Sequence, residues 1–164
     1  MFPADILRQA EQVLAAARAQ QLKIATVESC TGGLVAGALT EIAGSSDVVE
    51  RGFVTYANEA KTDMVGVPTA LIAKVGAVSE EVARAMAEGA LAHAPVDLTI
   101  AITGIAGPGG GSPSKPVGLV HFACARRGGA TVHERHLFPG SRSDVRLAAV
   151  RVALALLDAE IRQA

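Results

Sequence analysis

The chain has 164 residues, 50% of them hydrophobic and 19% charged, a balance that excludes a disordered chain and suits one domain with a sizeable core. Its formal net charge of −1 excludes the broad basic field typical of proteins that bind nucleic acid or anionic membranes. With one tyrosine and no tryptophan, the chain also lacks the stacking aromatic side chains of a single-strand-binding module.

We expect neither a targeting signal nor a membrane-spanning segment. Its first residues, MFPADILRQAEQ, lack the basic start, apolar stretch and cleavage site of a signal peptide, and no apolar run approaches the ~18 residues needed to span a bilayer. The two cysteines, Cys30 and Cys124, show no CxxC spacing, which argues against a structural zinc site or a disulfide framework. We therefore expect a cytoplasmic protein that contacts neither membrane nor nucleic acid.

Hydrophobic periodicity predicts helices and strands in the order α-β-α-β-α-α-β-β-β-α. The predicted helices cover residues 5–20, 31–43, 59–65, 68–75, 79–93 and 141–162. The predicted strands cover residues 23–28, 48–57, 97–103, 117–126 and 131–138. Asn58 and Ser79 are expected to cap the helices at whose starts they lie, and Gly52 is expected to mark a bulge in its strand.

The alternation of strands and helices in the first half predicts parallel pairing, whereas the last two strands form a hairpin around residues 127–129. We therefore expect a single domain over residues 1–164, a three-layer α/β/α sandwich built on a mixed, mostly parallel sheet. Ligand sites in such sheets lie beyond the carboxyl ends of strands. Three strands end at informative residues, namely Ser29, Tyr56 and Thr103.

Ser29 stands where a buried strand meets the start of a helix. A serine hydroxyl is a weak nucleophile that needs a base to take its proton. Backbone N–H groups that would hold a developing oxyanion or a phosphate belong to Thr31, Gly32 and Gly33. The alternative is that Ser29 or Thr31 merely caps the helix, and the spacing does not decide between the two.

Two features of the same turn restrict its chemistry. Position 27 is Val, so the G-x-S-x-G elbow of α/β-hydrolases is absent. Cys30 is a rival nucleophile, but its side chain should point away from that of Ser29, and we expect a small buried cysteine.

Tyr56 and Lys61 provide a candidate base. Tyr56 ends a strand and Lys61 lies one turn into the next helix, so both side chains can face the same cavity. A lysine acts as a general base when desolvation lowers its pKa, and the tyrosine would relay the proton or orient the lysine. The alternative, an exposed lysine beside a strand-end tyrosine, is the commoner pattern. The spacing differs from the Tyr-x-x-x-Lys of short-chain dehydrogenases.

A glycine-rich loop, residues 104–116, joins two strands, which excludes a dinucleotide-binding fingerprint, and it lacks the Gly-Lys-Ser/Thr of a P-loop. It is either a wall whose amides contact a polar ligand or a plain connection. Arg142 lies at a helix N-terminus, where a cation is unfavourable, so it either faces an anionic ligand or is simply exposed. His133 and His136 point to opposite faces of a strand and form a poor metal pair.

Together these pieces resemble the C-terminal domain family of the competence-damage-inducible protein CinA. The matching segments, in family order, are residues 28–33, 52–58 with Lys61, 76–79, 101–110 and 140–142. The resemblance implies a stand-alone bacterial nicotinamide-nucleotide amidohydrolase (NMN deamidase) that uses neither a metal nor another cofactor. It implies that Ser29 is the nucleophile, Lys61 the base and Tyr56 its helper. The nucleotide pocket would be completed by Thr103, Gly104, Gly107 and Arg142.

The expected reaction converts nicotinamide mononucleotide to nicotinate mononucleotide and ammonia. A different class of function is a non-catalytic nucleotide-binding or regulatory module, in which Ser29 is a cap and Lys61 a ligand contact. A nearer alternative is an amidase for another small carboxamide. The apolar excess leads us to expect a homodimer, and Glu28 is expected either to shape the turn or to tune Lys61.

Overall fold

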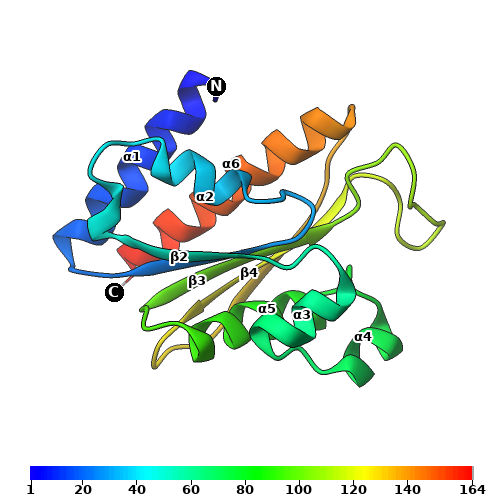
Figure 1. Ribbon diagram of the computed structural model, residues 1–164. Helices are drawn as coiled ribbons and strands as arrows, with labels where there is room; N and C mark the ends of the chain where they lie inside the picture. Colours follow the sequence, from blue (N-terminus) through cyan, green and yellow to red (C-terminus); the bar gives the residue numbers. More distant parts are fainter. Residues whose placement is uncertain (164) are drawn as a thin grey trace.

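A five-stranded sheet lies between two layers of helices in the computed structural model, which describes residues 1–163 (Figure 1). The helices are α1 (Ala4–Ala19), α2 (Leu34–Thr40), α3 (Asn58–Val65), α4 (Thr69–Val75), α5 (Glu80–His93) and α6 (Arg142–Arg162), with a short 3₁₀ turn η1 (Ser45–Asp47). The strands are β1 (Ile24–Glu28), β2 (Val49–Val54), β3 (Leu98–Gly104), β4 (Leu119–Arg126) and β5 (Val132–Leu137). The predicted order of elements is confirmed.

The sheet has the strand order β2-β1-β3-β4-β5. β1 pairs in parallel with both β2 and β3, whereas β4 pairs antiparallel with both β3 and β5. Within the described sheet, β4 is therefore the strand that opposes the other four. The predicted three-layer sandwich with a mixed, mostly parallel sheet is confirmed. Every residue of β1 is buried, as expected for a central strand with helices on both faces.

Each face of the sheet carries its own apolar layer. α1, α2 and α6 cover one face, and α3, α4 and α5 cover the other (Figure 1). The second layer decides where α3 lies, because α3 packs closely on α5. A Cβ added at Gly89 of α5 would overlap the carbonyl oxygen of Val65 in α3, so only glycine permits this approach. This close packing holds α3 at the carboxyl edge of the sheet.

Helix starts are well anticipated where a side chain caps the backbone. The hydroxyl of Ser79 accepts a hydrogen bond from the backbone N–H of Val82 at 3.3 Å, so its predicted capping role is confirmed. Ser141 and Asp144 form a reciprocal capping box that starts α6. Both caps depend on residues three apart in the sequence, which is why local pattern suffices to find them.

Two local predictions are wrong. Gly52 is paired in register with Thr26, and the irregularity in the β1–β2 ladder lies instead between the pairs Ile24–Val49 and Ala25–Arg51. Glycine is required at position 52 by close packing, because a Cβ there would lie 2.8 Å from the Thr26 hydroxyl oxygen. Asn58 is not a cap either. Ala57 is the N-cap of α3 and makes no side-chain capping bond, and Asn58 is the first helical residue.

Two elements are also shorter than expected by four residues or more. The helix predicted over 31–43 begins only at Leu34, because the chain first makes a turn in which Gly33 has φ +102°. The strand predicted over 48–57 ends at Val54, which leaves residues 55–57 as a link to α3. Both changes lengthen the loops at the carboxyl edge of the sheet. No helix within residues 1–163 combines the length and apolarity needed to cross a membrane.

Candidate active site

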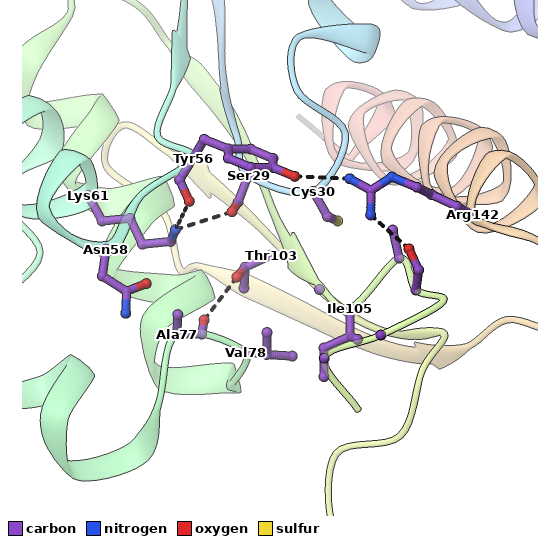
Figure 2. Close-up of a pocket in the computed structure, with 15 residues that line it drawn as sticks. Ser29, Cys30, Tyr56, Asn58, Lys61, Ala77, Val78, Thr103, Ile105 and Arg142 are labelled. Carbon is purple, nitrogen blue, oxygen red and sulfur yellow. Dashed lines mark hydrogen bonds between the residues drawn. The ribbon is translucent and has the colours of Figure 1, made fainter. Parts of the chain in front are cut away.

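A cavity of about 290 Å³ opens at the carboxyl edge of the sheet, where β1, β2 and β3 end (Figure 2). Its floor and walls come from the turn after β1, the start of α3, the link before α5, the glycine loop and the start of α6. Its polar side chains are those of Ser29, Tyr56, Asn58, Lys61, Thr103 and Arg142. Brought together from distant parts of the sequence, these groups surround one point in space.

The structure brings most of the sequence-predicted site residues into this cavity, but not all. The residues that line it are Ser29, Tyr56, Lys61, Thr103, Gly104, Gly107 and Arg142. Thr31, Gly32 and Gly33 are not among the lining residues. Thr31 is fully buried, and its hydroxyl is used inside the protein rather than in the cavity.

Ser29 and Lys61 are in direct contact. The backbone N–H of Ser29 donates to the carbonyl oxygen of Ile102 on β3 at 2.9 Å, which anchors the turn to the sheet. Lys61 comes from α3, and its Nζ donates to Ser29 Oγ at 3.1 Å. Although lysine is rarely buried, only 1% of Lys61 is exposed. The commoner alternative of an exposed lysine is therefore wrong.

The surroundings of Lys61 favour a neutral amine. Burial lowers the pKa of Lys61 below its usual value of 10.5. Within residues 1–163 the ammonium forms no salt bridge with a carboxylate. Its other hydrogen bonds are to the carbonyl oxygens of Thr55 at 2.8 Å and Tyr56 at 3.4 Å.

These three partners suit both protonation states of the amine. Carbonyl oxygens only accept, so a neutral Lys61 amine directs its two N–H groups to Thr55 and Tyr56 and its lone pair to Ser29. The hydroxyl of Ser29 then donates to the lone pair. When the amine is protonated, its third N–H donates to Ser29 Oγ instead. A proton can thus pass from serine to lysine without rearrangement of the heavy atoms.

Tyr56 has a different partner from the one expected. Its phenol is largely exposed, and its hydroxyl accepts a hydrogen bond from Arg142 Nη2 at 3.0 Å. The hydrogen bond of Tyr56 with Lys61 is made by its backbone carbonyl. Figure 2 shows the ring lying across the mouth of the cavity, from the Lys61 side toward Arg142. Among the described residues, no hydrogen bond joins the phenol to Lys61, as a proton relay between them would require.

Arg142 presents a positive charge at the opposite side of the cavity. It is the first residue of α6, and its Nη1 donates to the carbonyl oxygen of Gly107 at 2.8 Å. Both of its partners, Gly107 and Tyr56, are neutral, and in the described part of the chain Arg142 makes no ion pair. A guanidinium held by neutral acceptors keeps its charge and remaining N–H groups for an anion.

Glu28 shapes the nucleophile turn. Its fully buried carboxylate accepts hydrogen bonds from the Thr31 hydroxyl at 2.6 Å and from the backbone N–H groups of Val35 at 2.9 Å and Ala36 at 3.0 Å. A carboxylate at a helix N-terminus satisfies free N–H groups and complements the helix dipole. Of the two roles considered for Glu28, the structure supports the one in which it shapes the turn.

Sequence reasoning missed Asn58 as a cavity residue. Because α3 begins one residue earlier than expected, the Asn58 side chain lines the cavity beside Lys61 (Figure 2). The available signal was its place in the segment Gly52–Asn58, two residues after Tyr56. Thr103 was anticipated, and its hydroxyl donates to the Ala77 carbonyl oxygen at 2.9 Å, which ties the end of β3 to the link before α5.

The cysteines are poor nucleophiles in this structure. Burial raises the pKa of Cys30 to about 11 and that of Cys124 to about 12, so both remain thiols at neutral pH.

We expect iodoacetamide at pH 7 to leave both thiols of the folded protein unmodified, while it alkylates them in denaturant. Mass spectrometry measures this, and rapid alkylation of Cys30 alone in the folded protein would contradict it.

The histidines lie apart from the cavity. His121 on β4 and His133 on β5 are joined by a hydrogen bond of 2.9 Å between Nδ1 and Nε2, and burial lowers the pKa of His121 to about 4. In the part of the chain that is described, no set of three or more His, Cys, Asp or Glu side chains is placed to hold a metal ion. Lys61 is therefore the group in contact with Ser29 that can accept its proton.

Comparisons with known proteins identify relatives of this chain. Residues 7–161 match the model of the CinA C-terminal domain. The nicotinamide-nucleotide amidohydrolase PncC of Escherichia coli K12 is 49% identical over 157 residues, which cover 96% of this chain and 95% of that protein. A crystal structure of the competence/damage inducible protein CihA from Agrobacterium tumefaciens has a TM-score of 0.95 and 52% identity, and the match covers 97% of each chain.

Longer relatives contain this domain as one part. A CinA-like protein of Akkermansia muciniphila is 54% identical over 145 residues, which cover 88% of this chain. The chain spans only 35% of that protein's length. The match with PncC, by contrast, extends over nearly the whole of both chains.

Proposed function

The chain belongs to the CinA C-terminal domain family, and from this premise we propose that it is an amidohydrolase that converts nicotinamide mononucleotide to nicotinate mononucleotide and ammonia. The observation that carries the proposal is the 3.1 Å contact between buried Lys61 Nζ and Ser29 Oγ inside the cavity. The name of its relative PncC supports the choice of substrate. We propose that residues 1–164 act as one catalytic domain in the cytoplasm, without a cofactor.

The first chemical step is attack by Ser29 on the carboxamide carbon. As Oγ forms its bond to that carbon, neutral Lys61 accepts the hydroxyl proton, and the carbonyl electron pair moves onto the substrate oxygen. The backbone N–H of Cys30 makes no hydrogen bond to another described residue, and Cys30 lines the cavity. This N–H is our candidate donor to the oxyanion.

Collapse of this intermediate releases ammonia. Protonated Lys61 gives its proton to the departing nitrogen as the carbon–nitrogen bond breaks, which leaves an ester on Ser29. Water then attacks the ester carbon while neutral Lys61 takes a proton from it. The carbon–oxygen bond to Ser29 breaks, the proton returns to Oγ, and the carboxylic acid product leaves. One water is consumed and one ammonia is formed.

Recognition of the nucleotide is assigned to the opposite side of the cavity. Arg142 uses one N–H for the Gly107 carbonyl and one for the Tyr56 hydroxyl, and its remaining N–H groups are available to a phosphate. In this assignment Tyr56 orients Arg142 over the cavity and does not relay protons. Gly104 and Gly107 form the wall between the two ends of the site.

The non-catalytic alternative does not account for the burial of Lys61. A lysine buried without a carboxylate partner destabilises the fold, and simple contact with a nucleotide would not require it. An amidase for another small carboxamide uses the same dyad, so a panel of substrates separates that alternative from ours. The expected homodimer stays a prediction.

The test measures ammonia and acid product with purified protein and nicotinamide mononucleotide. We expect equal amounts of ammonia and nicotinate mononucleotide.

Replacing Arg142 with glutamine should raise KM for nicotinamide mononucleotide by about 10- to 100-fold, because a charge-assisted contact to phosphate is lost. The same variant should change KM for nicotinamide riboside, which has no phosphate, only a little. Binding without any ammonia over many hours would favour the regulatory module. Ammonia from a different carboxamide alone would contradict the proposed substrate.

A further inference from the structure

Arg146 holds the outer side of the turn that carries Ser29. It lies one helical turn after Arg142 on α6, is half-buried, and is not among the residues that line the cavity. Its Nε donates to the carbonyl oxygen of Cys30 at 3.1 Å, and its Nη2 donates to that of Thr31 at 3.2 Å. Among residues 1–163, Arg146 forms no salt bridge.

These contacts fix the orientation of successive peptide groups. In a trans peptide the C=O and N–H point in opposite directions, so holding one aims the other. Arg146 holds the carbonyl of Thr31, whose peptide group carries the Gly32 N–H. That N–H donates to the carbonyl of Ser29 at 2.9 Å, and the Ser29 carbonyl shares its peptide group with the Cys30 N–H. The N–H of Cys30, beside the nucleophile, makes no hydrogen bond to another residue of the described chain.

The turn is shaped to receive this guanidinium. Gly32 has φ +57°, and a Cβ there would lie 3.3 Å from Arg146 Nη2, so a larger residue would crowd the contact. Glu28 holds the same turn through the Thr31 hydroxyl, but that carboxylate also caps α2. Both hydrogen bonds of Arg146, in contrast, are to the turn itself.

We propose that Arg146 is a positioning residue: by holding the Thr31 carbonyl it orients the Gly32 N–H that binds the Ser29 carbonyl, and the Ser29–Cys30 peptide group fixed in this way keeps the backbone N–H of Cys30 aimed at the oxyanion that forms when Ser29 attacks. This inference rests on the proposed amidohydrolase activity. A donor that is already oriented stabilises the developing charge without reorganisation, and a misaimed donor loses most of that effect. The positive charge of Arg146 behind the turn favours the same negative oxygen.

A second phosphate contact is the competing role for Arg146, because it stands four residues after Arg142 on the same helix. The two roles differ in kinetics. Loss of a phosphate contact raises KM, whereas loss of oxyanion alignment lowers kcat and leaves KM nearly unchanged. Since Arg146 does not line the cavity and two of its N–H groups are directed at the turn, the geometry points to a change in kcat.

The experiment compares Arg146→Gln and Arg146→Lys with a matched control, Arg151→Gln. Arg151 is on the same helix and is also half-buried. Its Nε forms an ion pair with Asp5 Oδ2 at 2.6 Å, and neither residue lines the cavity. We expect Arg146→Gln to lower kcat by about 10- to 100-fold with KM within about three-fold of wild type. Arg146→Lys has one ammonium group for two carbonyls, so its kcat should lie between that of Arg146→Gln and that of wild type. Arg151→Gln should keep both constants even where its Tm drops.

An unchanged kcat in both Arg146 variants overturns the proposal, and so does a rise in KM with kcat preserved. If Arg146→Gln does not fold, as judged by circular dichroism, the kcat of Arg146→Lys relative to wild type tests the proposal.

A fluorophosphonate probe, which forms a tetrahedral adduct on serine, tests the inference without the proposed substrate. If wild type releases no ammonia from nicotinamide mononucleotide, the proposed function fails. The rate at which the probe labels Ser29 then tests the positioning role of Arg146 separately. Slower labelling of Arg146→Gln than of Arg151→Gln supports the proposal, whereas equal or absent labelling overturns it.

Discussion

Replacing Ser29 with alanine is expected to lower kcat for deamidation by on the order of 10⁴-fold or more. The variant has no oxygen to form the ester intermediate, so the reaction would depend on direct attack by water. The loss should appear in kcat, since only 8% of Ser29 is exposed and the proposed phosphate contact at Arg142 is untouched. Ammonia release at saturating nicotinamide mononucleotide measures it, with Tm as evidence of folding.

Ser46→Ala is the matched control for this variant. Ser46 is exposed in η1, outside the residues that line the cavity, so its kcat should equal that of wild type. Undiminished turnover in Ser29→Ala would remove the covalent mechanism. In that event Lys61 would have to activate water directly, and the contact between the two side chains would lose its proposed meaning.

Lys61→Met is expected to lower kcat by about 10²- to 10⁴-fold, the usual contribution of a general base. Methionine fills a similar volume but cannot accept the proton of Ser29. In wild type, activity should rise with pH as Lys61 loses its proton, at a pKa below 10.5 because the side chain is buried. The variant's residual rate should lack this rise. Exposed Lys74 on α4 provides the control, and Lys74→Met should keep both the rate and the pH profile.

The same group makes stability depend on pH with a defined sign. The pKa of Lys61 is lower in the folded state than in the unfolded state, where it is near 10.5. Below the folded-state pKa both states are protonated, and the full cost of burying the charge is present. As pH rises from the folded-state pKa toward 10.5, the unfolded state binds more protons, so the free energy of unfolding increases.

Denaturant unfolding of wild type and Lys61→Met at several pH values checks this linkage. The wild-type free energy of unfolding should increase relative to that of the variant as pH rises through the window below 10.5. Lys74→Met, which removes an exposed lysine side chain, is measured in the same way as the control. A difference between wild type and Lys61→Met that is constant with pH would contradict a desolvated Lys61.

Local sequence pattern carries much of the fold. The apolar run of β1 and the alternation around it identify a central strand, and caps such as Ser79 announce helix starts because both partners lie within one turn. The failures at Gly52 and Asn58 have the opposite origin. The bulge depends on how β2 lies against β1, and the role of Asn58 depends on which residue becomes the first of α3. Neither is determined by neighbours in sequence.

The candidate site divides in the same way. Sequence alone identified the serine turn, the tyrosine–lysine pair, the glycine loop and Arg142, because each follows the end of a strand or begins a helix and carries a reactive or charged group. It also directed attention to the Thr31–Gly33 amides. In the structure those residues do not line the cavity. The Thr31 hydroxyl and the backbone N–H of Val35 donate to the carboxylate of Glu28 inside the protein.

Sequence by itself determined which residue types gather at the carboxyl edge of the sheet and in what order the elements reach it. Only the tertiary structure decided which of those residues touch. Lys61 is buried against Ser29 because α3 packs on α5 through Gly89, and the Tyr56 phenol joins Arg142 because α6 returns to that edge from the end of the chain. Such contacts join residues tens of positions apart. Their geometry is set by packing between layers, which no local pattern encodes.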